Sequence, residues 1–181
     1  MEKPNGWDDA KAATGGDFEK PAAGGYVLGI VRIEEKPSDS GNKMITLYLD
    51  IAQGEWKNYH RELGEKLGKD CYLRYYQLTE AEKSIPFFKG MITSVEKSNP
   101  GYKWNWEPQT LRGKLVGANL REEEYTNKDG ERRLGLKIAY LCSLESVPGL
   151  KVLPPKLLSA SANTNAQSQS DIMPPQGDLP F

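Results

Sequence analysis

Alternating apolar and polar residues in the middle of the chain predict β-strands. The clearest run is 44–51, and the residues expected to face its core are Ile45, Leu47, Leu49 and Ile51. Residues 25–35 form an earlier candidate strand, with its core side assigned to Val27, Val31 and Ile33. Residues 70–78 form a third strand, with Cys71, Leu73 and Tyr75 opposite the side that carries Tyr72, Arg74 and Tyr76. Turn residues at 37–42 separate the first two strands.

The second half of the domain adds a helix and a hairpin. Ser84 is expected to cap a helix whose buried stripe follows the i, i+3, i+4, i+7 pattern of Phe88, Met91, Ile92 and Val95. Residues 113–125 and 131–144 read as two strands joined by 127–130, where an Asp-Gly pair favours a tight turn. A partly helical connection is expected between the second and third strands.

This order of elements indicates a mainly β protein. Three strands, a helix and two strands are the elements of a five-stranded OB-fold barrel with its helix between strands 3 and 4. Other small β-barrels and α+β folds share this order, so the side chains on the predicted faces must decide the function.

Charge divides the 181 residues into three segments. Residues 1–20 hold three lysines against five acids and read as a flexible N-terminal arm. Residues 21–158 hold 21 Lys and Arg against 18 Asp and Glu and form the expected folded domain. Residues 159–181 contain no Lys or Arg and little apolar surface, which predicts a disordered C-terminal tail. Residues 21–158 therefore carry a net positive charge although the net charge of the whole chain is −1. A net charge so close to zero also allows self-association into a homo-oligomer.

Several function classes find little support in the sequence. No run is long and apolar enough to span a membrane, so a cytoplasmic protein is expected. Two cysteines and one histidine are too few for a zinc site or a disulfide framework, and no cofactor motif is present. No phosphate-binding loop or nucleophile–base pair suggests an enzyme. The remaining catalytic alternative is a nuclease in which Asp50, Asp70 and Glu96 meet in space.

An exposed aromatic face is the main chemical signal. If the alternation holds, Tyr48, Tyr72 and Tyr76 point away from the core with Arg74 among them. Unpaired bases stack on aromatic rings for about 1–3 kcal/mol each, and arginine adds stacking and charge, so such a face suits single-stranded nucleic acid. The alternative is that these tyrosines only pack the sheet.

Other rings and cations extend the candidate interface. They are Trp56 and Lys57 after the second strand, Lys103 and Trp104 after the helix, and Lys128 and Arg132 around the last turn. Each has a structural alternative: Trp56 packs a short helix, Trp104 and Trp106 plug the end of the barrel, and the hairpin cations only aid solubility. Glu122, Glu123 and Glu124 interrupt the basic surface and are expected at a solvated strand end.

The last four residues form a candidate protein-binding tip. Asp178, Leu179, Pro180 and Phe181 combine an acid, two apolar residues and a terminal aromatic ring. A hydrophobic pocket rimmed by Lys or Arg would bind both the ring and the terminal carboxylate.

The chain resembles a known group of proteins in both its tip and its body. The tip is similar to the acidic and hydrophobic C-terminus of bacterial single-stranded DNA-binding proteins, although only Asp178 and Asp171 replace the usual run of acids. The body resembles single-stranded DNA-binding proteins of phages and prophages of Gram-positive bacteria. The stretches that carry this likeness are 21–26 (PAAGGY), 50–59 (DIAQGEWKNY), 86–90 (PFFKG), 98–104 (SNPGYKW) and 121–125 (REEEY).

The resemblance implies an OB-fold that coats and protects unpaired DNA during phage replication or recombination in the host cytoplasm. It also implies that the tip recruits replication and recombination proteins. The alternative is an adaptor whose OB-like barrel binds protein, with its aromatic residues serving as packing.

Overall fold

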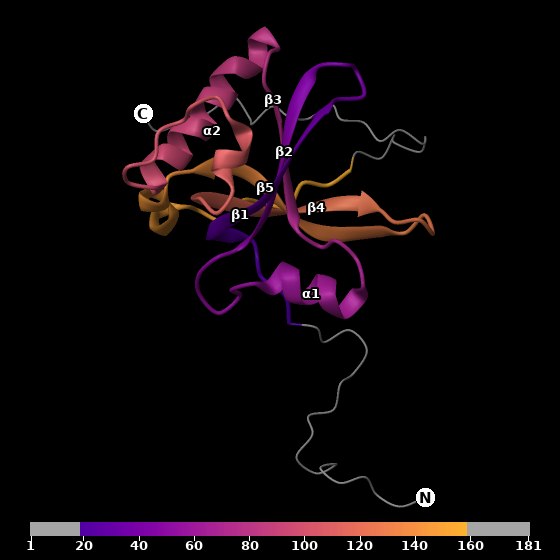
Figure 1. Cartoon of the computed structure of the whole chain (residues 1–181). Coiled ribbons are helices and arrows are strands. Elements are labelled where there is room, and N and C mark those ends of the chain that lie inside the picture. Colours follow the sequence, from indigo (N-terminus) through magenta and orange to yellow (C-terminus); the bar gives the residue numbers. More distant parts are fainter. Residues whose placement is uncertain (1–18, 159–181) are drawn as a thin grey trace, which may run out of the picture.

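The computed structural model describes residues 19–158, which include the range 21–158 expected for the domain. The tail and most of the N-terminal arm lie outside the described residues. Figure 1 shows the elements along the chain. The strands are β1 (Gly24–Pro37), β2 (Lys43–Ile51), β3 (Leu73–Leu78), β4 (Leu115–Thr126) and β5 (Arg132–Cys142). The α-helices are α1 (Tyr59–Leu67) and α2 (Ile85–Ser98), and the 3₁₀ helices are η1 (Glu82–Ser84), η2 (Pro108–Leu111) and η3 (Leu144–Gly149).

The five strands form one antiparallel sheet in the order β3-β2-β1-β4-β5. Strand β1 is long enough to pair with β4 through residues 24–29 and with β2 through residues 28–37. The sheet is open, because no hydrogen-bonded ladder joins β3 to β5 among the described residues, although Cα atoms of these edge strands come within 8 Å. The expected five strands, with a helix between the third and fourth, are confirmed.

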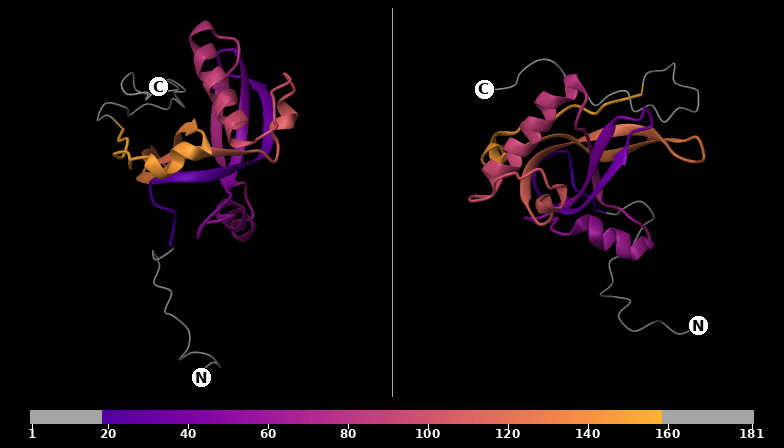
Figure 2. Two further views of the ribbon diagram at one scale, coloured as in Figure 1. Left: turned by 90° about the vertical axis from the view of Figure 1, so that its left-hand side faces the viewer. Right: turned by 45° about the horizontal axis from the view of Figure 1, so that its top comes forward.

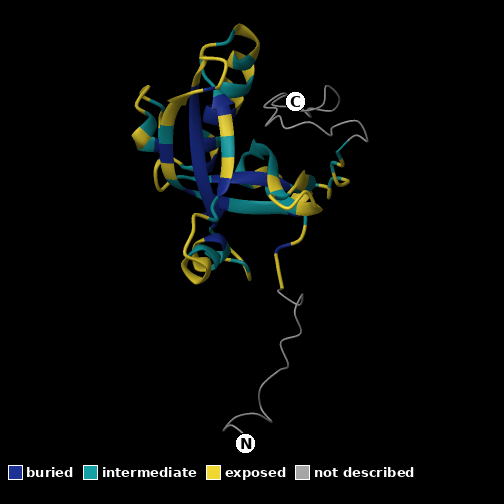
Figure 3. Ribbon diagram, turned by 90° about the vertical axis from the view of Figure 1, so that its right-hand side faces the viewer, coloured by how far each residue is buried: buried dark blue, intermediate teal, exposed yellow. Residues whose placement is uncertain are grey.

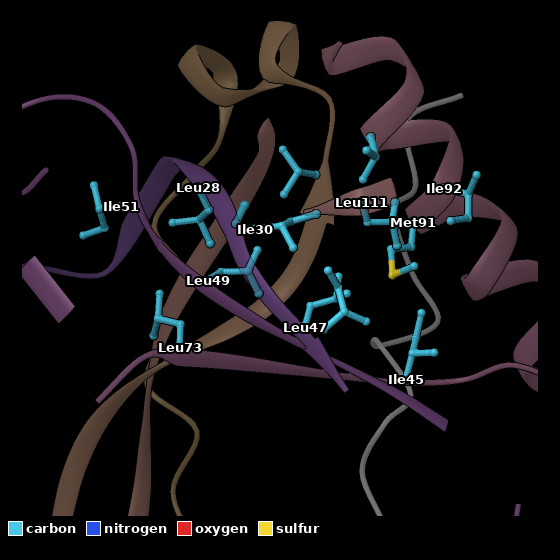
Figure 4. Close-up of a cluster of buried hydrophobic side chains, with 14 of the residues drawn as sticks. Leu28, Ile30, Ile45, Leu47, Leu49, Ile51, Leu73, Met91, Ile92 and Leu111 are labelled. Atoms are coloured by element: carbon cyan, nitrogen blue, oxygen red, sulfur yellow. The ribbon is translucent and has the colours of Figure 1, made fainter. Parts of the chain in front are cut away.

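The core lies between the inner face of the sheet and α2, as Figure 4 shows. The predicted helical stripe is confirmed, because Met91, Ile92 and Val95 are buried and Phe88 packs against them. Leu111 from η2 is fully buried in the same cluster. Burying an apolar side chain of this size contributes about 1.5–3 kcal/mol, so this cluster anchors α2 to the sheet. The two turned views in Figure 2 show α1 and α2 at opposite ends of the strands.

A bulge in β1 changes which of its side chains face the core. Ile30 pairs with Leu49 and Arg32 with Tyr48, so Val31 is an extra residue without a partner in β2. Such an insertion shifts the alternation of the strand by one residue. Leu28, Ile30 and Ile33 are therefore buried, whereas Val27 and Val31 are only partly buried. The assignment of Val27 and Val31 to the core side was wrong, and that of Ile33 was correct.

The structure confirms the predicted hairpin turn but not the predicted helix cap. The 127–130 hairpin is confirmed: the backbone N–H of Asn127 donates to the carbonyl of Glu131, and Gly130 has φ +81°. Ser84 stands at the start of α2, but its hydroxyl donates to the carbonyl of Ala81 and caps no helical N–H. The third strand begins at Leu73, three residues later than expected.

Residues after β5 cover one half of the outer face of the sheet. A methyl group at Gly117 would lie 2.6 Å from Cγ2 of Val147, and one at Gly25 would lie 2.8 Å from the carbonyl oxygen of Val147. These glycines let η3 pack directly on β1 and β4. Farther along, the backbone of Lys156 exchanges hydrogen bonds with β4 at Glu122 and Glu124. No helix among residues 19–158 is long and apolar enough to cross a membrane.

The close packing at Gly117 predicts opposite effects for two alanine substitutions. Gly117→Ala should destabilise the protein by about 1–3 kcal/mol, because its methyl group would collide with Val147 and with the carbonyl of Ser143. Gly90→Ala in α2 meets no atom within 4 Å and should stabilise the helix by about 0.5–1 kcal/mol. Denaturant titration of both variants measures the free energies of unfolding. A Gly117→Ala protein as stable as the wild type would contradict the tight contact with η3.

Candidate nucleic-acid interface

The outer side of β1, β2 and β3 is the half of the sheet that η3 leaves uncovered. Figure 3 looks onto it, with the dark-blue, buried β2 running between two partly exposed strands and no helix in front. Directly paired residues of antiparallel strands point to the same side. One row across this β1–β3 face is Arg32, Tyr48 and Arg74, and the next is Glu34, Thr46 and Tyr76.

Tyr48 lies on this face, but its ring is covered. The guanidinium carbon of Arg32 lies 3.8 Å from the centre of the ring, and that of Arg74 lies 5.4 Å away. The residue is only 8% exposed. The expectation of a free stacking ring was therefore wrong for Tyr48, because the long side chains of its two strand neighbours fold over it.

Arg32 is a member of the face that the sequence did not reveal. In a regular strand it would share the inward side with Leu28 and Ile30, and the bulge at Val31 turns it outward. A bulge leaves no clear mark in a single sequence. The only available signal is a charged residue in the middle of an otherwise apolar strand.

Asp70 holds both arginines in place. Nη2 of Arg32 donates to Oδ2 of Asp70 at 2.6 Å, and Nη2 of Arg74 lies 3.9 Å from the same oxygen. The backbone N–H of Tyr72 donates to Oδ1 at 3.1 Å. Partial burial acts to raise the pKa of Asp70, but the Tyr72 N–H and the Arg32 guanidinium outweigh it and lower the pKa. Asp70 is therefore a carboxylate at neutral pH.

The aromatic residues of β3 divide as expected. Tyr76 is 40% exposed on the outer side, and Tyr72, just before the strand, is partly exposed. Tyr75 faces inward against the core, and burial raises its pKa to about 12. Arg74 and Tyr76 are thus brought together on one accessible surface, and partly exposed Tyr72 lies just before β3 in the chain.

Trp56 and Lys57 lie beyond the far end of β2, beside α1. The Trp56 ring makes an edge contact with Tyr59 at 5.5 Å between centres and packs against the core, while Lys57 is exposed. These contacts agree with the alternative in which Trp56 packs beside a short helix.

Lys103 and Trp104 lie near the opposite end of β2. Trp104 contacts Phe88 and Trp106 edge-on, and it lines a hollow of about 430 Å³ together with residues of the β1–β2 hairpin. Nζ of Lys103 lies 3.5 Å from Glu96. Trp106 is 79% exposed, so Trp104 helps to close this end of the sheet and Trp106 does not.

Lys128 and Arg132 are exposed at the tip of the β4–β5 hairpin, which extends to the right in Figure 1, on the side away from α2. Arg132 lies 3.5 Å from Glu124. The three glutamates of β4 are not simply solvated, which corrects the expectation. Glu123 pairs with Arg121 at 2.8 Å, and Glu124 also accepts the backbone N–H of Leu158. They help to hold the C-terminal segment on β4.

The acids considered for a nuclease have separate structural partners. Asp50 accepts the backbone N–H groups of His60 and Arg61 at the start of α1, each at 3.0 Å. Asp70 binds Arg32, and Glu96 accepts the N–H of Trp104 at 2.9 Å. Residues 19–158 contain no group of three or more His, Cys, Asp or Glu side chains arranged to hold a metal ion.

The tip at 178–181 lies outside the described residues, so its expected role stays a prediction. No protein-family model matches the chain, and no curated protein matches it. A function is therefore inferred from the residues of the fold and from the resemblance of the sequence.

His60 predicts a pH dependence of stability. Its ring is buried, with Nδ1 3.0 Å from the carbonyl oxygen of Cys71 and no hydrogen-bond partner for Nε2 within the described part of the chain. Burial lowers its pKa below the ordinary 6.5, despite the opposing charge of Asp50. The unfolded chain therefore binds more protons below pH 6.5, so stability is complete above that pH and falls as the pH drops through the folded pKa.

Melting temperatures measured from pH 7.5 down to 5 should fall in the wild type and change less in His60→Gln. The glutamine keeps an amide for the carbonyl of Cys71 but has no proton to gain in this range. Identical pH profiles for the two proteins would show that His60 is not the titrating group.

Proposed function

We propose that this protein binds and protects single-stranded DNA without catalysing a reaction, using the β1–β3 face. The supporting observation is the uncovered outer side of β1, β2 and β3, which combines exposed Tyr76, partly exposed Tyr72 and two arginines. A duplex hides its base faces within the stack, whereas a single strand presents them to such a surface.

The strand order supports a finer assignment of the fold. In the proposed OB-fold, β1 is shared between two parts of the sheet, and the approach of β3 to β5 curls the sheet toward a barrel. The second and third strands of this fold carry the oligonucleotide surface in known examples. Here those strands are β2 and β3, which carry Tyr48, Arg74 and Tyr76 on their outer side.

The hairpin cations extend the proposed interface. The β4–β5 hairpin extends on the side away from α2 in Figure 1, and its exposed Lys128 and Arg132 would add attraction for the phosphate backbone. The terminal Asp178, Leu179, Pro180 and Phe181 would recruit replication or recombination proteins, in a phage-encoded role that the resemblance supports.

Fluorescence anisotropy of dye-labelled oligo-dT tests the proposed face. Tyr76→Ala should weaken binding by about 1–3 kcal/mol, because one stacking ring is lost. Phe87→Ala is the matched control, because Phe87 is a partly exposed aromatic residue on α2, which packs on the inner face of the sheet. The affinity of the wild type should also fall with salt at a log–log slope of about −0.7 for each phosphate contacted.

A second matched pair of variants distinguishes the loss of a contact on the β1–β3 face from a change in the net charge of the protein. Arg74→Ala should weaken binding more than Arg61→Ala, although both remove one cation with similar side-chain exposure, 45% and 52%. Equal losses within each pair would place binding elsewhere on the molecule. If the wild type binds no oligo-dT at low salt, the protein-binding adaptor replaces the proposed function.

Deleting residues 171–181 should not reduce the affinity for oligo-dT. The deleted residues include two acids and no Lys or Arg, so they supply no cation to the phosphate backbone. Anisotropy titration of the truncated and full chains makes the comparison. Weaker binding by the truncated chain would contradict the assignment of DNA binding to the domain and of protein binding to the tip.

A further inference from the structure

The outer row of β1, β2 and β3 holds two guanidinium groups around one carboxylate and one ring. Arg32 lies over Tyr48 at 3.8 Å and donates to Asp70 at 2.6 Å, while Arg74 reaches the same ring at 5.4 Å and the same carboxylate oxygen at 3.9 Å. The arginines come from different strands, and Asp70 comes from the segment after α1. The arrangement therefore depends on the tertiary fold.

We propose that Arg32 and Arg74 form a subsite for a backbone phosphate of single-stranded DNA, which the carboxylate of Asp70 occupies in the free protein. This inference rests on the proposed function. Tyr48 is a positioning residue in this subsite, because both guanidinium groups lie over its ring. No base stacks on this ring.

The chemistry of the groups favours this exchange. Carboxylates and phosphates are both anions that accept paired hydrogen bonds from the planar guanidinium group. The side chains of Arg32 and Arg74 remain nearly half exposed, so an incoming strand reaches them without opening the core. Ion pairs as exposed as these contribute little to stability, so exchanging one anion for another costs little.

The neighbouring charges leave the subsite weakly basic. Glu34 lies 3.5 Å from Nε of Arg32, and its other oxygen accepts Nζ of Lys36 at 2.7 Å. Glu34 is thus shared with a lysine, whereas Asp70 faces both arginines. Asp70 is the carboxylate whose removal should change phosphate binding most.

Asp70→Asn tests the exchange. The amide keeps an oxygen that can accept the Tyr72 N–H but removes the charge that holds Arg32 and Arg74. In anisotropy titrations with dye-labelled oligo-dT, this variant should bind about 2- to 5-fold more tightly than the wild type, because an exposed ion pair no longer has to be broken.

Glu65→Gln is the matched control for Asp70→Asn. Glu65 lies 3.9 Å from Arg61 on α1, so this variant also neutralises one carboxylate beside an exposed arginine. It should bind oligo-dT with nearly wild-type affinity. An equal gain in both variants would mean that only the overall charge matters and would overturn the subsite.

Arg32→Gln gives a second readout that does not depend on Asp70→Asn folding well. Loss of one phosphate contact should reduce the log–log salt slope by about 0.7, which a merely structural role of Arg32 would not do. Thermal unfolding checks that the variant is folded.

The outcomes distinguish the subsite from the proposed function. Wild-type binding with no gain in Asp70→Asn and an unchanged salt slope in Arg32→Gln overturns the subsite alone. Absence of oligo-dT binding by every variant, Asp70→Asn included, overturns the subsite and the proposed function together.

Discussion

The bulge in β1 decides which side chains the outer face presents. One extra residue at Val31 lets Leu28, Ile30 and Ile33 all reach the core, although regular alternation would send Ile33 to the opposite side. The same shift places Arg32 beside Tyr48. Core packing and surface chemistry therefore depend on one irregularity: a regular strand would expose Ile33 and direct a guanidinium toward apolar side chains.

The two halves of the outer face differ because the chain after β5 packs on only one of them. Glycines at 25 and 117 allow η3 to lie against β1 and β4, and the glutamates of β4 help to hold the segment that continues to residue 158. That half of the sheet is occupied by the chain itself. The half formed by β2, β3 and the end of β1 is not covered by this segment, and it is the candidate interface.

The arrangement of charges on the candidate face says more about its possible ligands than the net charge of the chain does. The net charge of −1 would argue against nucleic acid, yet the candidate face places two arginines in one row. Most of its cations are paired with nearby acids, which keeps the surface only weakly basic in the free protein. The proposed binding of single-stranded DNA depends on these exposed ion pairs and on the rings beside them.

By itself, the sequence determined the order of the elements along the chain, with the helix between β3 and β4, the 127–130 turn and the placement of Tyr75 on the side opposite Arg74 and Tyr76. These follow from short-range patterns, since the period of side-chain alternation and the backbone preferences of Asp-Gly are local properties. Only the tertiary structure decided that Tyr48 is covered, that Arg32 belongs to the face and that Trp56 and Trp104 lie at opposite ends of β2. The physical reason is that burial depends on the side chains of neighbouring strands, which are distant in sequence. A single bulge then changes those neighbours without changing the composition of the strand.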